Sequence, residues 1–120
     1  MHKIFFIFLL TIASSIYSQD LENGTYQEFF DNKNPKYEIS YLNGKKNGIE
    51  KFWYESGQLK MQSEFKNGKE HGLWQQWYEN GQQKSKSEWV SGKKNGLEWI
   101  WDSDGNLLSK DHYQNGKIVQ

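Results

Sequence analysis

The sequence predicts an all-β fold, an elongated and twisted antiparallel meander of stacked β-hairpins built from 24-residue units. All 11 glycines recur in three columns with this spacing, and many follow a small polar residue, as is typical of tight turns. Between the turns, apolar residues alternate with a period of two, as in strands, and show no helical period. The columns are Gly24, Gly48, Gly72 and Gly96; Gly57, Gly81 and Gly105; and Gly44, Gly68, Gly92 and Gly116.

Residues 1–18 are predicted to be a cleaved export signal. An apolar run at residues 4–10 follows Lys3, and the next residues end in small side chains at Ser18. The apolar run is shorter than the roughly 20 residues of a membrane-spanning helix, which favours a cleaved signal over the alternative of a retained anchor. We therefore expect a secreted, periplasmic or cell-envelope protein with one repeat domain over residues 19–120.

The composition argues against several classes of function. The chain has 120 residues with 15 acidic and 15 basic side chains, and every basic one is lysine. Nucleic-acid binding normally uses a basic patch and arginine contacts to bases, so no nucleic-acid partner is expected. The absence of cysteine from the sequence excludes disulfides and thiolate chemistry. With six tryptophans among 17% aromatic residues, the core is expected to be aromatic.

The first repeat, residues 24–47, is degenerate. Phe29 and Phe30 stand where later repeats carry Trp and Tyr, Lys33 replaces the second-column glycine, and Pro35 follows. A weakened first copy is typical of a terminal capping repeat. Three fuller repeats follow at residues 48–71, 72–95 and 96–119.

Each repeat is expected to contain two strands and two turns, the turns lying at residues 55–57, 79–81 and 103–105, and at 66–68, 90–92 and 114–116. All are predicted to be three-residue loops, in which a type I turn is followed by a left-handed glycine. A two-residue type I′ turn is the alternative at Asn-Gly pairs. The first strand of each repeat exceeds the second by about two residues, which predicts a stagger or bulge near the first-column glycine.

Three-residue loops at every turn would gather the apolar side chains on one face, because a one-residue change in a loop reverses the side of everything after it. Trp74 shares its column with Glu50 and Glu98, so it is predicted to lie on the charged face, more exposed than Trp77. The predicted apolar face contains Ile49, Trp53, Leu59, Met61, Phe65, Leu73, Trp77, Trp89, Leu97, Trp99, Trp101, Leu107 and Tyr113. The predicted charged face contains Glu50, Lys60, Gln62, Glu64, Lys84, Lys86, Glu88, Glu98 and Lys110.

The recurring Trp53, Trp77 and Trp101 are interpreted as core residues. Burying each ring would stabilise a chain that is otherwise poor in aliphatic side chains. The alternative is a stacking platform for a sugar or an extended peptide.

The repeat motif is Gly-x-x-x-x-Trp-Tyr-Glu-x-Gly-Gln-x-Lys followed by Phe/Trp-x-x-Gly-Lys-x-x-Gly. It resembles the variant class of MORN repeats over residues 24–116. The resemblance implies short β-hairpin units and no catalytic residue. Bacterial chains of this class are often labelled YwqK-type antitoxins, which implies a protein partner, while other MORN proteins imply scaffolding or lipid contact. Its structural positions here are Gly48, Trp53, Gly57, Phe65, Gly68, Gly72, Trp77, Gly81, Trp89, Gly92, Gly96, Trp101, Gly105, Tyr113 and Gly116.

No catalytic, cofactor or metal site is predicted. His71 and His112 stand in unrelated columns, and a metal site needs three or four convergent ligands. The serines of the repeats lack a positioned base. The recurring carboxylates could suggest a glycosidase pair, but they are interpreted as solvated strand charges. These are Glu50 and Glu98, and Glu64 and Glu88.

The sequence therefore predicts a non-enzymatic exported module that binds another protein, with Trp74, Tyr54 and Tyr78 as candidate contacts. Repeat sheets present extended surfaces, and terminal strands invite strand addition or self-association. One alternative is a cell-surface glycan-binding module that uses exposed aromatic residues, and another is an antitoxin or immunity-like inhibitor, as the family label implies. The lysine pairs at 45–46 and 93–94 could contact anionic lipid but are interpreted as solubilising residues.

Overall fold

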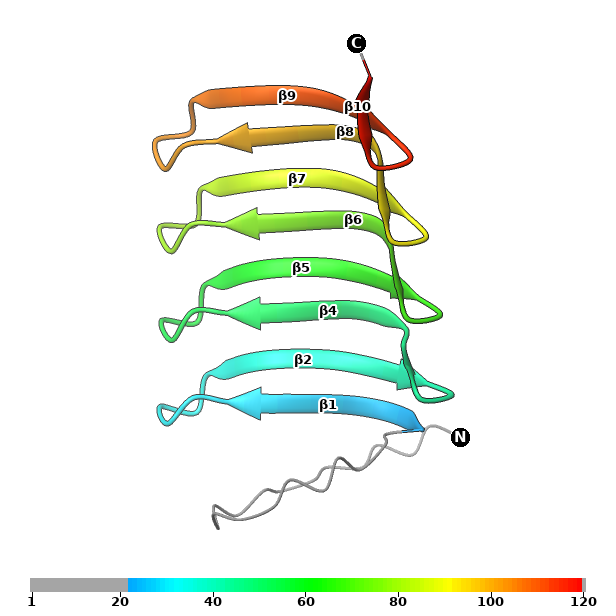
Figure 1. Ribbon diagram of the computed structural model, residues 1–120. Helices are drawn as coiled ribbons and strands as arrows, with labels where there is room; N and C mark the ends of the chain where they lie inside the picture. The colour runs from blue at the N-terminus through cyan, green and yellow to red at the C-terminus, as the bar shows by residue number, and fades with distance from the viewer. Residues whose placement is uncertain (1–21, 120) are drawn as a thin grey trace.

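The computed structural model describes residues 22–119, which form one antiparallel sheet of β-hairpins stacked one above another (Figure 1). The sheet order is β1-β2-β4-β5-β6-β7-β8-β9-β10, and β3 pairs with β2 beside this path. Over these residues there is no helix long and apolar enough to cross a membrane. The predicted export signal lies outside the described residues. The strands are β1 (Asn23–Phe29), β2 (Pro35–Leu42), β3 (Lys45–Lys46), β4 (Gly48–Trp53), β5 (Leu59–Lys66), β6 (Lys69–Trp77), β7 (Gln83–Val90), β8 (Lys93–Trp101), β9 (Leu107–Gln114) and β10 (Lys117–Val119).

The prediction of three-residue loops is confirmed for the turns that carry the second-column glycines. The N–H of Gly57 donates to the Tyr54 carbonyl (2.9 Å), and the N–H of Tyr54 donates to the Gln58 carbonyl (2.9 Å). Gly57 has a φ of 92°, so a type I turn is followed by a left-handed residue. The same bonds recur at residues 78–82 and 102–106. In the first repeat Lys33 takes the left-handed position (φ 70°), so the capping repeat keeps the turn without its glycine.

The prediction of three-residue loops is wrong for the turns that carry the third-column glycines. Lys66 pairs directly with Lys69, and both Asn67 and Gly68 have positive φ (52° and 79°). These features define a two-residue type I′ turn, which needs positive φ at both central positions and accepts Asn-Gly readily. The same pair of positive φ values occurs at residues 43–44, 91–92 and 115–116.

Two kinds of bulge interrupt the pairing. Ser63 pairs with Trp74 and Phe65 pairs with Glu70, so β6 has two more residues than β5 over this stretch, which includes Gly72. An equivalent shift in β8 includes Gly96, and the predicted bulge near the first-column glycine is thereby confirmed. These bulges lie where the strands curve in Figure 1.

A second bulge adds one residue at the start of the second strand in each hairpin. Phe52 pairs with Met61, but Trp53 pairs with Leu59, which leaves Lys60 without a partner residue. The equivalent extra residues in the later hairpins are Lys84 and Leu108. This bulge was not predicted from the sequence.

The two-residue turns and the one-residue bulges overturn the predicted single apolar face. Indole rings lie on both faces, because each of these features reverses the side of the residues that follow it. One face, here called the inner face, carries Tyr26, Tyr37, Ile39, Glu50, Phe52, Met61, Ser63, Phe65, Trp74, Ser87, Trp89, Glu98, Ile100 and Tyr113. The other, the outer face, carries Ile49, Trp53, Leu59, Gln62, Glu64, Leu73, Trp77, Lys86, Glu88, Leu97, Trp99, Trp101, Leu107 and Lys110.

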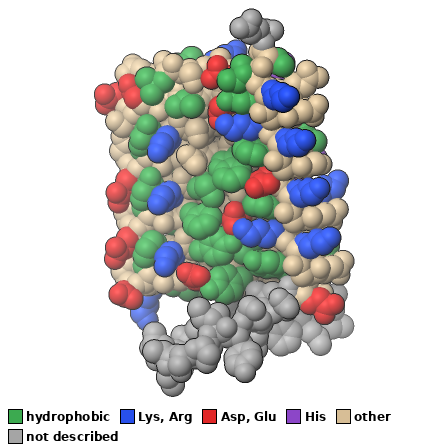
Figure 2. Space-filling view, viewed as in Figure 1, with side chains coloured by type: hydrophobic (Ala, Val, Ile, Leu, Met, Phe, Trp, Pro, Cys, Tyr) green, Lys and Arg blue, Asp and Glu red, His purple; other side chains and the backbone are tan. Residues whose placement is uncertain are grey.

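The core of the described residues lies on the inner face. Ile39 is fully buried and Phe65 is 8% exposed, whereas Ile49 and Leu73 on the outer face are substantially exposed. The face toward the viewer in Figure 2 has hydrophobic side chains along its middle and regularly spaced lysines on either side. The core therefore consists of side chains that pack against one another on the inner face of the curved sheet.

Candidate functional site

A regular row of aromatic and lysine side chains runs across the hairpins beside the three-residue turns. In each of the first three hairpins the aromatic residue precedes the turn and the lysine is the bulge residue that follows it. The lysine Nζ atoms lie 6.0, 5.3 and 5.5 Å from the ring centroids in successive repeats. We call this set the aromatic–lysine row; its pairs are Phe30 with Lys36, Tyr54 with Lys60, and Tyr78 with Lys84.

The two tyrosine rings of this row are held in place by hydrogen bonds to the next repeat. The Tyr54 hydroxyl donates to the Trp77 carbonyl (2.9 Å), and the Tyr78 hydroxyl donates to the Trp101 carbonyl (3.0 Å). Both tyrosines are half-buried. These two predicted partner contacts thus combine a structural bond at the hydroxyl with a ring face that lies under a lysine.

The row ends in the last repeat, where Asp102 replaces the tyrosine and Leu108 replaces the lysine. The Asp102 carboxylate accepts hydrogen bonds from the backbone N–H of Asn106 (2.8 Å) and from its side-chain amide (2.9 Å). These bonds lower the pKa of Asp102, the side-chain bond contributing most. Asp102 therefore closes its own turn.

A small cavity of about 170 Å³ lies between successive members of the row. Its lining combines apolar and cationic groups, so it could hold an uncharged side chain beside an anionic one. The lining residues are Tyr54, Lys60, Met61, Gln76, Trp77 and Lys84.

Two of the recurring carboxylates, Glu50 and Glu98, are buried on the inner face, contrary to the prediction that they are solvated, whereas Glu64 is exposed as predicted. Glu50 is 4% exposed and accepts hydrogen bonds from the Tyr37 hydroxyl (2.7 Å), Lys46 Nζ (2.6 Å) and the Ser63 hydroxyl (3.2 Å). Glu98, two repeats later, is also buried and forms an ion pair with the half-buried Lys94. A buried carboxylate needs such partners to offset its lost hydration. These residues act in the core, and their reversed face explains why the prediction failed.

The Tyr37–Glu50 pair should make the fold sensitive to alkali. Burial, and then the hydrogen bond to the Glu50 carboxylate, raises the pKa of Tyr37 well above its ordinary value of 10.0. The folded protein then holds this proton more tightly than the unfolded chain, so the stabilisation is complete below about pH 10 and is lost as pH rises further. Urea unfolding between about pH 8 and pH 11 should show this loss.

Substituting Tyr37→Phe should flatten that alkaline dependence, whereas Tyr41→Phe, which removes a tyrosine from the same strand outside the Glu50 pair, should not. A remaining slope is expected from Tyr26, because its hydrogen bond to Glu28, followed by burial, raises its pKa to about 12. An unchanged slope in Tyr37→Phe would contradict the assignment to this pair.

Trp74 lies on the inner face rather than on an exposed charged face. Its ring centroid is 5.2 Å from that of Trp89 at an interplanar angle of 35°. Trp74 and Trp77 are both half-buried and lie on opposite faces. In this repeat Trp74 and Glu70 occupy the columns of Glu50 and Lys46, so an aromatic contact takes the place of the ion pair.

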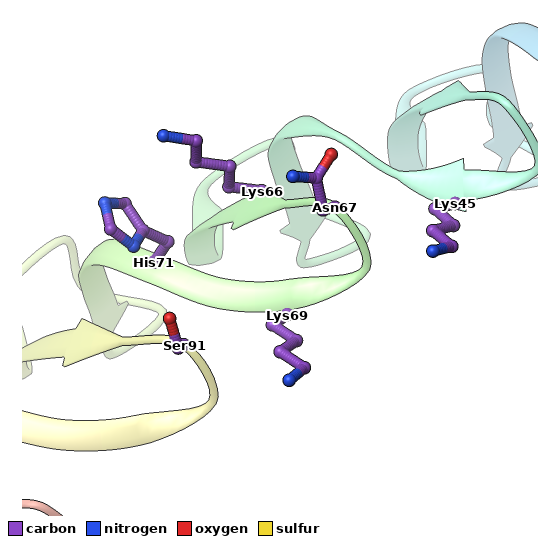
Figure 3. Close-up of a pocket in the computed structure, with 6 residues that line it drawn as sticks. All are labelled: Lys45, Lys66, Asn67, Lys69, His71 and Ser91. Atoms are coloured by element: carbon purple, nitrogen blue, oxygen red, sulfur yellow. The ribbon is translucent and has the colours of Figure 1, made fainter.

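A larger hollow of about 430 Å³ lies at the two-residue turns. Figure 3 shows Lys45 and Lys69 extending to one side of the ribbon and Lys66 and His71 to the other, so the cations do not converge. Asn67 and Ser91 complete its lining. Within residues 22–119, no group of three or more His, Cys, Asp or Glu side chains is placed to hold a metal.

The C-terminal edge of the described sheet carries two exposed leucines. β9 pairs with β8 along its length but with β10 only from His112 to Gln114, which leaves residues 107–111 as a free edge among the described strands. Leu107 and Leu108, at the start of β9, are 55% and 63% exposed, and Ile118, which pairs with Tyr113 toward the other end of β9, is 61% exposed.

Comparison with known proteins identifies the repeats. The family model for the MORN repeat variant matches residues 22–43, 46–67, 70–90 and 94–119. No matching relative was found among curated proteins. The four matches cover most of the chain with the spacing of its glycine columns, and they confirm the resemblance inferred from the motif. The chain therefore belongs to the MORN repeat variant family.

Proposed function

We propose that this protein is an exported, non-catalytic repeat module that binds another protein through its C-terminal sheet edge. The observation that carries the proposal is the free edge of β9 with its exposed Leu107 and Leu108. The apolar segment at residues 4–10 supports export. An inhibitor of a toxin would be one form of such a module.

Free sheet edges are normally protected by charges, especially lysine, because their unpaired backbone groups attract other strands. The columns of Leu108 in the two preceding repeats hold Lys60 and Lys84, and the column of Leu107 holds Leu59 and Gln83. In the last repeat, Leu108 thus stands where the preceding repeats have lysine, and it does so on a strand whose residues 107–111 are free among the described strands. Each leucine is already partly buried, so covering the rest of its side chain in an interface would contribute about 1–2 kcal/mol.

The test is site-specific photo-crosslinking in cell-envelope fractions from cells that express the full chain. A photoreactive residue at Lys110, on the free edge, should capture a defined protein, and one at Lys51, in the middle of the sheet, should not. Leu107→Lys with Leu108→Lys should abolish that capture. Leu42→Lys with Val90→Lys is the matched control. These two apolar side chains are 49% and 46% exposed, and each lies at the end of its strand, whereas Leu107 and Leu108 lie at the start of β9.

Two results would contradict the proposal. One is capture of the same protein by the Leu107→Lys, Leu108→Lys variant, and the other is capture of cell-wall polysaccharide in place of protein. Sequencing the N-terminus of the recovered protein tests export, since cleavage near Ser18 is expected. An N-terminus that retains residues 1–18 would contradict cleavage and favour the alternative of a retained anchor.

A further inference from the structure

We infer that the aromatic–lysine row is a groove for a peptide in the polyproline II conformation that carries an acidic residue at every third position. This inference rests on the proposed function in taking the partner to be a protein. It uses a surface separate from β9, so the two can fail independently.

The spacing of the row matches this helix. Successive members are one repeat apart, which is two strands, or about 9.5 Å across the sheet. A polyproline II helix has three residues per turn and advances about 9.3 Å per turn. The hairpins are stacked almost directly above one another in Figure 1, so a ligand that crosses the strands meets each member in the same orientation. A peptide in this conformation would therefore present every third residue to successive lysines.

The row is rigid at its aromatic positions. The hydroxyl bonds of Tyr54 and Tyr78 to the next repeat fix both rings before any ligand arrives. Domains that recognise polyproline II segments dock them in aromatic-lined grooves, where the preformed helix costs little conformational entropy. The cavity of about 170 Å³ between the two levels, with Met61 and Gln76 in its lining, offers space for a prolyl ring.

The charges of the row favour one acidic group per turn of the ligand. Lys60 and Lys84 are exposed, and within residues 22–119 neither forms an ion pair. Lys36 pairs with Glu28 at 3.6 Å. Glu55 and Glu79 are exposed in the adjacent turns and would repel a continuous run of negative charge. A ligand with single acidic residues separated by uncharged ones can pair with Lys60 and Lys84 and avoids the stronger repulsion that Glu55 and Glu79 would exert on a continuous acidic run.

The row limits the length of the ligand. It spans two repeat steps, about 19 Å across the sheet. About six or seven residues of polyproline II helix cover this distance. A nine-residue probe therefore fills the groove with a margin at each end.

The experiment measures binding of a fluorescent (Pro-Pro-Glu)₃ peptide to the full chain by anisotropy at low salt. Lys60→Glu with Lys84→Glu should weaken binding by about tenfold or more, equivalent to 1.4 kcal/mol. Lys66→Glu with Lys69→Glu is the charge-matched control, because these two lysines are exposed like Lys60 and Lys84 but lie at a two-residue turn, at the other end of the strands from the row. The control should stay within twofold of the parent protein.

Peptides of altered pattern test the helix and the charge. A peptide with the same composition but its three glutamates in one block should bind several-fold more weakly, and (Pro-Pro-Lys)₃ should not bind. The inference is overturned by equal binding of the block peptide, by equal weakening in the two lysine variants, by stronger binding of an acidic polysaccharide, or by no binding of (Pro-Pro-Glu)₃. If the photoreactive residue at Lys110 captured no protein but (Pro-Pro-Glu)₃ still bound as expected, the proposed function would be contradicted and the inferred peptide groove would not.

Discussion

Replacing Ile39 by alanine is expected to lower the free energy of unfolding by about 2–5 kcal/mol. Ile39 is fully buried on the inner face, and no other described apolar side chain is as buried. Removing its outer atoms forfeits the transfer energy and leaves a cavity that a single curved sheet closes poorly. Urea unfolding at neutral pH, followed by tryptophan fluorescence, measures the change.

Leu42→Ala is the control for this prediction. Leu42 lies on the same strand and is 49% exposed, so its loss should cost less than about 1 kcal/mol. If Ile39→Ala leaves too little folded protein to measure, Ile39→Val should still cost about 0.5–1.5 kcal/mol. Equal losses in the Ile39 and Leu42 variants would show that the inner face is not the core.

The strand and turn positions could be predicted from the sequence because glycine columns report backbone requirements directly. Gly57 must adopt a left-handed backbone conformation for its loop to close, and the same requirement recurs at Gly81 and Gly105. The loop length was not determined in the same way. Asn67-Gly68 suits both a two-residue and a three-residue loop, and only the shorter one forms.

The two faces could not be assigned because errors of a single residue reverse them. The outer face carries enough apolar residues, such as Ile49 and Leu73, to resemble a core in the period-two pattern. The buried positions include Glu50 and Ser63, which are polar and give no hydrophobic signal. A signal was nevertheless present: Lys46 precedes Glu50 by four residues, and the same pair recurs two repeats later at 94 and 98, as expected of an ion pair inside the fold.

The aromatic–lysine row also had a signal in the sequence. An aromatic residue is followed six positions later by lysine at 30 and 36, at 54 and 60, and at 78 and 84. This spacing has meaning only once the bulge is known, because the bulge leaves each of Lys60 and Lys84 without a partner residue on the neighbouring strand, with its Nζ over the aromatic ring. The candidate site was therefore only partly predicted, through Tyr54 and Tyr78.

Replacing Gly96 by alanine should destabilise the fold by about 2–4 kcal/mol, the sum of backbone strain and a steric conflict. Gly96 has a φ of 123°, which L side chains rarely adopt, and an added Cβ would overlap Oε2 of Glu88 and lie 2.8 Å from its Cδ and 3.0 Å from its Cβ. The carboxylate can move away, but the Glu88 Cβ is held by its strand. Urea unfolding again measures the loss.

Gly44→Ala separates the two causes. Gly44 also has a positive φ, of 70°, but a Cβ there would meet nothing within 4 Å, so only the left-handed strain of about 1–2 kcal/mol is expected. Glu88→Ala should recover part of the loss when combined with Gly96→Ala, and none when combined with Gly44→Ala. Because Gly96 lies in the two-residue bulge of β8 and Gly44 in a turn, a larger loss at Gly96 would show that the bend of the strands, as well as their reversal, requires glycine. Equal losses at both positions would mean that the first-column glycines are needed for their backbone angles alone.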